Sequence, residues 1–201
     1  RLLKSGLTLS VRKPIESGCQ RQGTTLVPAD ASDYVSIYNA SSTDNCSLDD
    51  VCRYRYEPAI SPQRAITLAD ETVSVEQLLA ASQGKAKDDV LLVEGAGGFY
   101  SPLCSDGLNA DLAEAMQAQV ILVVRDRLGC INQALLSLAA IESRGLECFA
   151  VVVNQIPSTA DEDIAMDNLA DLRARLKQPV LPYNANESTN TLDKLLNLIR
   201  L

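Results

Sequence analysis

Charged side chains follow two apolar runs of the sequence, where they could bind phosphate groups. Lys13 opens the stretch Lys13-Pro14-Ile15-Glu16-Ser17-Gly18, and Glu94 follows the run Val90–Val93. A lysine at a strand end can donate to phosphate oxygens, and a carboxylate there suits magnesium, which prefers oxygen ligands. Gly97 and Gly98 would let the backbone approach phosphates closely. The alternatives are a solvated lysine at a strand edge and a glycine-rich turn closed by a capping carboxylate.

Four further polar residues are candidates for the same or a neighbouring site. Asp33 could be a second carboxylate for the metal, although Asp30 is its rival and either could instead cap a helix. Asn132 could bind a ligand carboxylate or a neighbouring subunit, or simply begin a helix. Asn154 offers an amide donor and acceptor that suit an adenine edge, or it is an ordinary turn residue.

These candidates lie at the ends of strands that alternate with helices. The sequence predicts strands at 7–13, 90–94, 120–124, 149–154 and 180–182, and helices at 30–39, 61–69, 74–83, 108–117, 131–143, 161–177 and 189–200. This alternation indicates one α/β domain over 1–201, a doubly wound, mainly parallel sheet with helices on both faces. Ligands bind at the C-terminal ends of the strands in such sheets. The pattern is weakest over 40–60.

Composition excludes several classes of function. The 201 residues carry a net charge of −8, which argues against nucleic acid or an anionic membrane as a partner. No apolar run approaches the roughly 20 residues needed to span a bilayer. The chain has six cysteines without a C-x-x-C pair and no histidine, so we expect no zinc site and no Ser-His-Asp or Cys-His catalysis. Reduced thiols in a cytosolic protein are the expectation.

Four segments together resemble the dethiobiotin synthetases. They are KPIESG at 13–18, VEGAGGFYSPL at 93–103, VILVVRDRLGCINQALLS at 120–137 and VVVNQIP at 151–157, and they occur in the order and spacing of that family. The resemblance implies a P-loop NTPase-like fold and an ATP-dependent cyclo-ligase of biotin synthesis. It would close 7,8-diaminopelargonate with carbon dioxide to dethiobiotin, through a carbamate and a carbamic-phosphoric anhydride. ATP, Mg²⁺, a homodimer and a cytoplasmic location are implied as well.

The resemblance also implies a role for each candidate residue. Lys13 would neutralise the carbamate and the transferring phosphoryl group, Ser17 would hold the diamine, and Asp33 and Glu94 would bind magnesium. Implied nucleotide contacts are Asp33, Glu94, Gly95, Ala96, Gly97, Asn154, Pro182, Tyr183 and Asn184. Implied contacts to the substrate's tail, made across a two-fold axis, are Leu128, Gly129 and Asn132. The following helix has a markedly apolar face, Ile131, Leu135, Leu136 and Leu138, and would pair with its two-fold mate.

One family motif does not occur in the sequence. No stretch reads G-x-x-x-x-G-K followed by Ser or Thr, the phosphate-binding P-loop. The opening RLLKSG is typical of the last turns of a helix, so we expect a strand and the P-loop upstream of it. The competing hypothesis is a non-catalytic or regulatory domain of the same fold. Taken by itself, this polypeptide is expected to bind ATP poorly.

Overall fold

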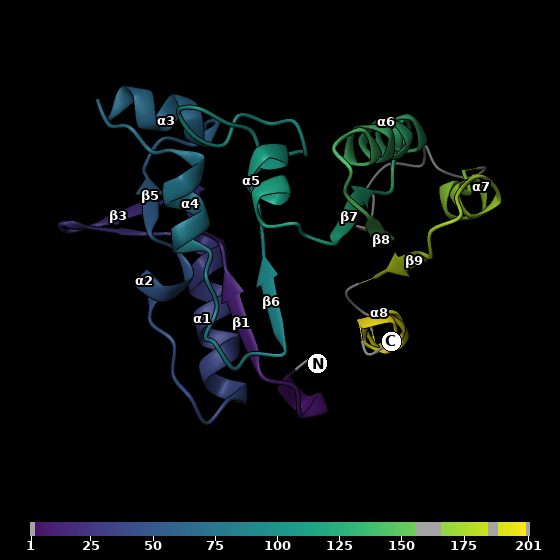
Figure 1. The fold of residues 1–201 in the computed structure, drawn as a ribbon, viewed down its shortest axis with the longest axis horizontal. Helices are drawn as coiled ribbons and strands as arrows, with labels where there is room; N and C mark the ends of the chain where they lie inside the picture. Colours follow the sequence, from purple (N-terminus) through teal and green to yellow (C-terminus); the bar gives the residue numbers. More distant parts are fainter. Residues whose placement is uncertain (1–2, 156–165, 185–188, 200–201) are drawn as a thin grey trace. The chain divides into compact units, whose positions relative to one another are not determined.

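The structure is a computed structural model that describes residues 3–155, 166–184 and 189–199 (Figure 1). The chain folds into two compact units. We call Leu2–Met116 the N-terminal unit and Gln117–Leu201 the C-terminal unit, and describe each by itself. The single domain over 1–201 stays a prediction. Across the described ranges, no helix has both the length and the apolar character that a membrane crossing needs.

The N-terminal unit places two strands of the predicted sheet side by side. Its elements are η1 Leu3–Ser5, β1 Leu9–Arg12, β2 Ile15–Ser17, β3 Gln20–Gln22, β4 Thr25–Val27, α1 Ala29–Ser41, α2 Leu48–Val51, β5 Tyr54–Tyr56, α3 Pro62–Leu68, α4 Val75–Ala81, β6 Val90–Val93 and α5 Asn109–Ala115. Strand β1 pairs with β6 in parallel, and Arg12 lies opposite Val93. Because the strands are parallel and in this register, Lys13 and Glu94 leave the sheet at the same end.

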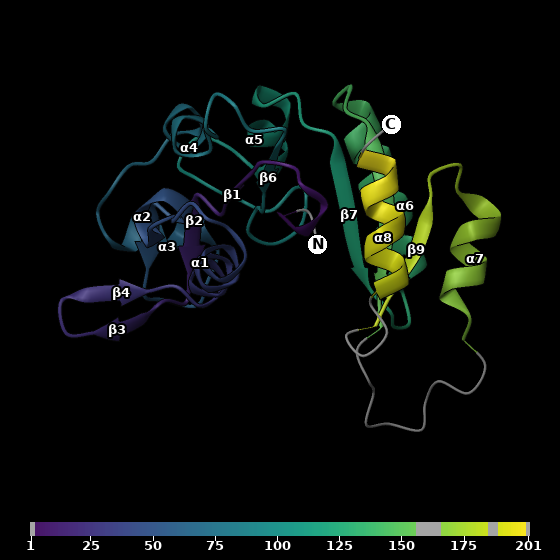
Figure 2. The ribbon, with the colours of Figure 1, turned by 90° about the horizontal axis from the view of Figure 1, so that it is seen from below.

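Shorter strands of this unit lie outside that pair. Strand β2 pairs with β5 in parallel, and β3 with β4 forms an antiparallel hairpin that extends from the rest of the unit (Figure 2). Neither β2–β5 nor α2 was predicted, and both α2 and β5 fall in the weakly patterned region 40–60. Three-residue strands and a one-turn helix are too short to produce a clear hydrophobic period.

Two apolar clusters hold the N-terminal unit together. One packs β2 and β5 against α3, α4 and α5 through Ile15, Tyr56, Ala65, Ile66, Val73, Leu78, Leu103, Cys104 and Leu112. The other packs β1 against α1 and α2 through Val11, Ala31, Tyr38, Val51 and Cys52. Buried apolar residues therefore fix the end of β1 and the first turn of α1, which frame the candidate site.

The C-terminal unit is a parallel α/β sheet. Its elements are β7 Val120–Arg125, α6 Cys130–Ser143, β8 Cys148–Asn154, α7 Asn168–Arg175, β9 Val180–Tyr183 and α8 Thr189–Ile199. The strands lie in the order β7-β8-β9, all parallel, and Figure 1 shows α6 and α8 on opposite faces of them. The middle strand β8 is almost wholly buried, as its continuous apolar run predicts.

Parallel strands alternating with helices confirm the predicted doubly wound α/β fold. The five predicted strands appear with bounds shifted by one or two residues. The predicted helix at 161–177 is shorter among the described residues. Asp167 caps its start by accepting from the Ala170 N–H at 2.9 Å, and it ends at Arg175. Positions 161–165 lie outside the described residues.

Candidate functional site

Lys13 is the centre of a cluster of charges at the end of β1. Its Nζ donates to Glu94 Oε1 at 2.9 Å and to the Gly95 carbonyl at 3.3 Å, and lies 3.2 Å from Asp30 Oδ2. An ammonium group has three hydrogens, so these three oxygens can satisfy it. The predicted neighbours Lys13 and Glu94 are thus brought into contact, as the parallel register of β1 and β6 requires.

Burial and charge act in opposite directions on the Lys13 ammonium. The residue is 4% exposed, whereas the carboxylates of Asp30 and Glu94 remain open to solvent. Burial alone lowers the pKa of Lys13, but Glu94 and Asp30 outweigh it, so the pKa lies above its usual value. Lys13 therefore stays protonated at neutral pH. One positive and two negative charges leave the cluster with an excess of one negative charge, which suits a cation at the exposed oxygens.

The second carboxylate beside Lys13 comes from Asp30, the rival of Asp33. Asp33 is exposed one turn further along α1, and in the described part of the chain it forms no ion pair with Lys13. The geometry favours Asp30 as the partner of Glu94, and the metal role of Asp33 stays a prediction.

Glu16 holds the start of α1, and sequence reasoning did not single it out. Its side chain is buried, and its two carboxylate oxygens accept from the backbone N–H groups of Asp30 and Ala31, both at 3.1 Å. Pro28, which precedes the helix, makes no side-chain capping bond. A carboxylate suits the positive end of the helix dipole. Glu16 thereby fixes the turn that carries Asp30.

The glycine-rich loop after β6 is held by side chains from its own unit. Gly97 has a φ of +83°, a left-handed conformation that favours glycine. The Gly98 N–H donates to Ser101 Oγ at 2.8 Å, and Asn109 accepts from the Ala96 N–H at 3.0 Å. These hydrogen bonds give the loop a defined conformation. Sequence reasoning missed Asn109, since an asparagine beside a predicted helix start reads as a cap.

Ser17, predicted to hold the diamine, lies half-buried at the end of β2. Its hydroxyl donates to the Ile60 carbonyl at 2.6 Å. A hydroxyl oxygen also accepts, so its lone pairs are the part of the group suited to a substrate amine. The substrate role of Ser17 stays a prediction.

The predicted adenine-binding residues lie side by side in the C-terminal unit. Asn154 ends β8 opposite Tyr183 of β9, and Pro182 lies opposite Val153. Asn184 follows directly, and the backbone carbonyl of Tyr183 accepts from the Gln155 N–H at 2.7 Å. The structure brings this group together at one strand-end edge, while its adenine role stays a prediction.

The segment Leu128–Asn132 joins β7 to α6 and presents an apolar tip. Leu128 is 86% exposed, and Gly129 has a left-handed φ of +91° at the start of α6. Asn132 is exposed on the first turn of that helix. The leucines of the predicted apolar face of α6 do not share one environment. Leu138 is buried within the C-terminal unit, whereas Leu135 and Leu136 are exposed. These exposed leucines are where a partner could pack.

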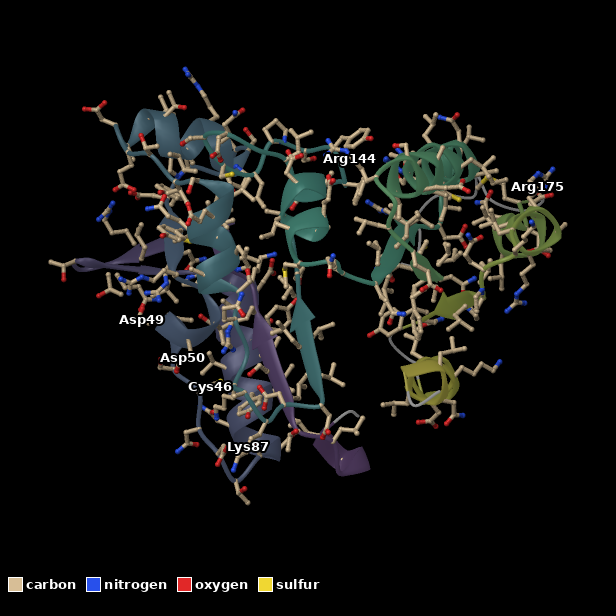
Figure 3. All side chains as sticks on the ribbon, in the orientation of Figure 1. Cys46, Asp49, Asp50, Lys87, Arg144 and Arg175 are labelled. Carbon is tan, nitrogen blue, oxygen red and sulfur yellow. The ribbon has the colours of Figure 1, made fainter. Side chains whose placement is uncertain are left out.

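Two concave regions lie apart from the predicted residues. A groove of about 400 Å³ follows the β3–β4 hairpin and β5, lined in part by Thr24, Thr25, Arg53, Tyr54, Tyr56 and Glu71. A cavity of about 130 Å³ is lined in part by Arg12, Tyr38, Lys85, and by Cys46 and Asp50, which Figure 3 labels. Among the described residues, no group of three or more His, Cys, Asp or Glu side chains could hold a metal ion unaided. A metal at Asp30 and Glu94 would therefore need further oxygen ligands.

Known proteins resemble this chain over most of its length. A family model described as an AAA domain matches residues 1–185. A protein of Ruthia magnifica subsp. Calyptogena magnifica, named ATP-dependent dethiobiotin synthetase BioD, is 38% identical over 156 residues, which are 78% of this chain and 70% of the relative. Proteins of the same name are 36% identical in Pseudoalteromonas translucida (86% of this chain, 75% of the relative) and 38% identical in Xylella fastidiosa strain Temecula1 (83% and 72%).

Proposed function

Because the chain belongs to the dethiobiotin synthetase family, we propose that it closes 7,8-diaminopelargonate and carbon dioxide into dethiobiotin, a step of biotin synthesis, converting ATP to ADP and phosphate. The predicted class, an ATP-dependent ligase, is confirmed by these relatives. The alternative, a non-catalytic domain of the same fold, is not favoured. The observation that carries the proposal is the buried Lys13 ammonium between the exposed carboxylates of Asp30 and Glu94.

The chemistry needs charge neutralisation more than it needs a protein base. One substrate amine adds to carbon dioxide to give a carbamate. A carbamate oxygen then attacks the γ-phosphorus of ATP, which releases ADP and forms a carbamic-phosphoric anhydride. The second amine attacks the carbonyl carbon, phosphate leaves with its electron pair, and the ureido ring closes. Lys13 supplies a fixed positive charge for the carbamate and the transferring phosphoryl group, the kind of preorganised stabilisation that phosphoryl transfer uses.

We infer that Asp30 and Glu94 are the protein ligands of a magnesium ion. Both present exposed carboxylate oxygens near Lys13, and carboxylate oxygens are what Mg²⁺ prefers. The ion would supply positive charge at the ATP phosphates. The backbone of Gly95, Ala96 and Gly97 would lie along those phosphates.

We assign the remaining roles to the C-terminal unit. Asn154 would read adenine, with Pro182, Tyr183 and Asn184 lining its surroundings. Leu128, Gly129 and Asn132 would contact the tail of a diamine bound to the other subunit of a homodimer. The exposed leucines of α6 support this dimer, since a two-fold interface would cover them.

We also infer that the enzyme acts in the cytoplasm. All six cysteines are free, and most are buried. Burial raises the pKa of the thiols, as for Cys104 to about 11. Free thiols that are not paired into disulfides are typical of proteins kept in a reducing compartment.

The experiment is a product assay with the full-length protein. Purified enzyme is given 7,8-diaminopelargonate, bicarbonate, ATP and Mg²⁺, and dethiobiotin and ADP are measured by mass spectrometry. We expect one ADP per dethiobiotin, and neither product when the diamine is omitted. ATP hydrolysis without dethiobiotin, or no reaction by a folded protein, would contradict the proposal.

A further inference from the structure

Asn109, the first residue of α5, makes a set of hydrogen bonds that the proposed reaction does not yet use. The residue is 9% exposed. Its Oδ1 accepts from the Ala96 N–H at 3.0 Å. Its Nδ2 donates to the carbonyls of Ala96, Gly98 and Ser101 at 2.8, 3.0 and 3.3 Å. One buried side chain thus both accepts a hydrogen bond from the backbone of the glycine-rich loop and donates hydrogen bonds to it.

The shape of the loop depends on this side chain as well. A Cβ at position 95 would lie 2.3 Å from Asn109 Oδ1, so only glycine allows the amide to reach the Ala96 N–H. A Cβ at position 97 would lie 2.8 Å from Ser101 Oγ. The glycines therefore leave room for the protein's own side chains on the inner side of the loop.

Asparagine suits this position better than an acid of the same size. The amide accepts one bond and donates two hydrogens, whereas an ionised carboxylate only accepts. A carboxylate at 109 could keep the bond from the Ala96 N–H, but it would face three carbonyl oxygens that it cannot satisfy. The contacts of Asn109 thus demand a donor and an acceptor in one side chain.

The loop is joined to the charge cluster at its other end. The Gly95 carbonyl accepts from Lys13 Nζ, and the Glu94 N–H donates to the Arg12 carbonyl at 2.9 Å. Movement of the loop would therefore shift the Gly95 carbonyl, which accepts from Lys13, and the neighbouring Glu94 carboxylate. If the loop were mobile, its conformational entropy would be lost when a ligand binds, and this loss would weaken binding.

We propose that Asn109 is a positioning residue that holds the Glu94–Gly98 loop in its nucleotide-binding conformation. The inference rests on the proposed function, which places this loop along the phosphates. Asn109 acts through the backbone of the loop and touches no reacting atom. Its loss should therefore weaken nucleotide binding while the rest of the fold persists.

The test compares two buried asparagines in the full-length protein. Asn109→Ala should weaken ADP binding about tenfold by calorimetry, the effect expected when one or two net hydrogen bonds no longer order the loop. Asn168→Ala is the matched control. Asn168 is 7% exposed, is the first residue of α7, and donates through Nδ2 to Asp126 at 2.8 Å. We expect it to lower the melting temperature similarly, by about 2–4 °C, and to leave ADP affinity unchanged.

Hydrogen exchange separates this inference from the function on which it rests. In Asn109→Ala without nucleotide, the Ala96 amide should exchange at least about tenfold faster, because it has lost its acceptor. In the wild type, ADP should slow exchange across 95–98. If ADP protects the loop but Asn109→Ala binds ADP within twofold of wild type, the positioning role is overturned. If ADP does not protect the loop of the wild type, the proposed nucleotide site is wrong instead.

A second variant covers the case in which the alanine variant does not fold. Asn109→Asp keeps the size of the side chain and the acceptor for the Ala96 N–H. It should still weaken ADP binding several-fold, since the donated bonds are gone. A folded Asn109→Asp protein with wild-type ADP affinity would also overturn the inference.

Discussion

The loops that follow β6 and β7 differ in what holds them and in what they expose. Both leave parallel strands, and a buried asparagine at the start of a helix contacts each, Asn109 for the first and Asn168 for the second. The loop after β6 begins beside the Lys13 cluster and is then tied to Asn109 along its backbone. The loop after β7 ends in Leu128, which projects into solvent, and in a glycine with open space around it.

This difference teaches what each loop needs in order to act. Hydrogen bonds from side chains of its own unit hold several backbone groups of the loop after β6, so the shape of the loop is preorganised for a small charged ligand. An exposed Leu128, with Leu135 and Leu136 nearby in the sequence, leaves apolar surface in water, which a partner would cover favourably. We therefore expect changes near the first loop to affect chemistry and changes near the second to affect assembly.

The largest effect should come from Lys13. In the full-length protein, Lys13→Ala should lower turnover by roughly 10²-fold or more, the scale of losing a positioned charge in the transition state. Lys13→Arg should not restore full activity, because the guanidinium is larger and planar. Steady-state kinetics of dethiobiotin formation measures both.

Lys87 provides the matched control for that substitution. It is an exposed lysine of the same unit, between α4 and β6, and is labelled in Figure 3. Lys87→Ala should keep turnover close to wild type. Turnover of Lys13→Ala within a few-fold of wild type would remove Lys13 from the reaction.

The next effect separates Asp30 from Asp33. Asp30→Asn and Glu94→Gln should each raise the magnesium concentration needed for half-maximal activity by roughly tenfold, since each removes a charged oxygen ligand. Asp33→Asn should change it little, because this carboxylate lies a turn away from Lys13. A magnesium titration of ATP binding and of turnover decides, and a large effect at Asp33 alone would restore the sequence prediction.

Assembly should respond to changes in the exposed leucines of α6, the helix that follows the loop after β7. Leu136 is 64% exposed on α6, so Leu136→Glu should fold, dissociate the dimer and weaken diamine binding together, because a two-fold interface carries each change twice. Ile37→Glu is the control, since Ile37 is 63% exposed on α1. It should leave assembly unchanged. Sedimentation measures the oligomeric state of each protein, and circular dichroism checks that it is folded. A wild-type protein that is already a monomer would argue against the shared interface.

The smallest effect is a loss of stability in alkaline solution. Burial raises the pKa of Cys52 from 9.0 to about 12 and that of Cys104 to about 11. The unfolded chain releases these protons first, so stability is fully present below pH 9 and falls as the pH rises toward 12. Each thiol contributes at most about 1.4 kcal/mol per pH unit. Urea unfolding between about pH 8 and 11 should show this slope, and Cys52→Ala should reduce it.

Local sequence patterns were sufficient for the frame of the molecule and for part of its site. Continuous apolar runs predicted the strands β6, β7 and β8 and their place in an α/β sheet. Because parallel strands end at one edge, the same patterns predicted that Lys13 and Glu94 meet there. The expectation that Asn154 and Tyr183 lie together came from the family resemblance, and the register of β8 and β9 places them opposite each other.

Tertiary packing decided which polar side chains complete the charge cluster. Asp30 and Asp33 are both plausible from sequence, but they lie about 4.5 Å apart along the helix axis. Burial of Ala31, and the hydrogen bonds that Glu16 accepts from the N–H groups of Asp30 and Ala31, set where the first turn of α1 lies and so favour Asp30 beside Lys13. Asn109 reaches Ala96 across thirteen residues, and no local period encodes that contact. Strand ends follow from short-range hydrophobic pattern, whereas these contacts arise only when separate elements pack together.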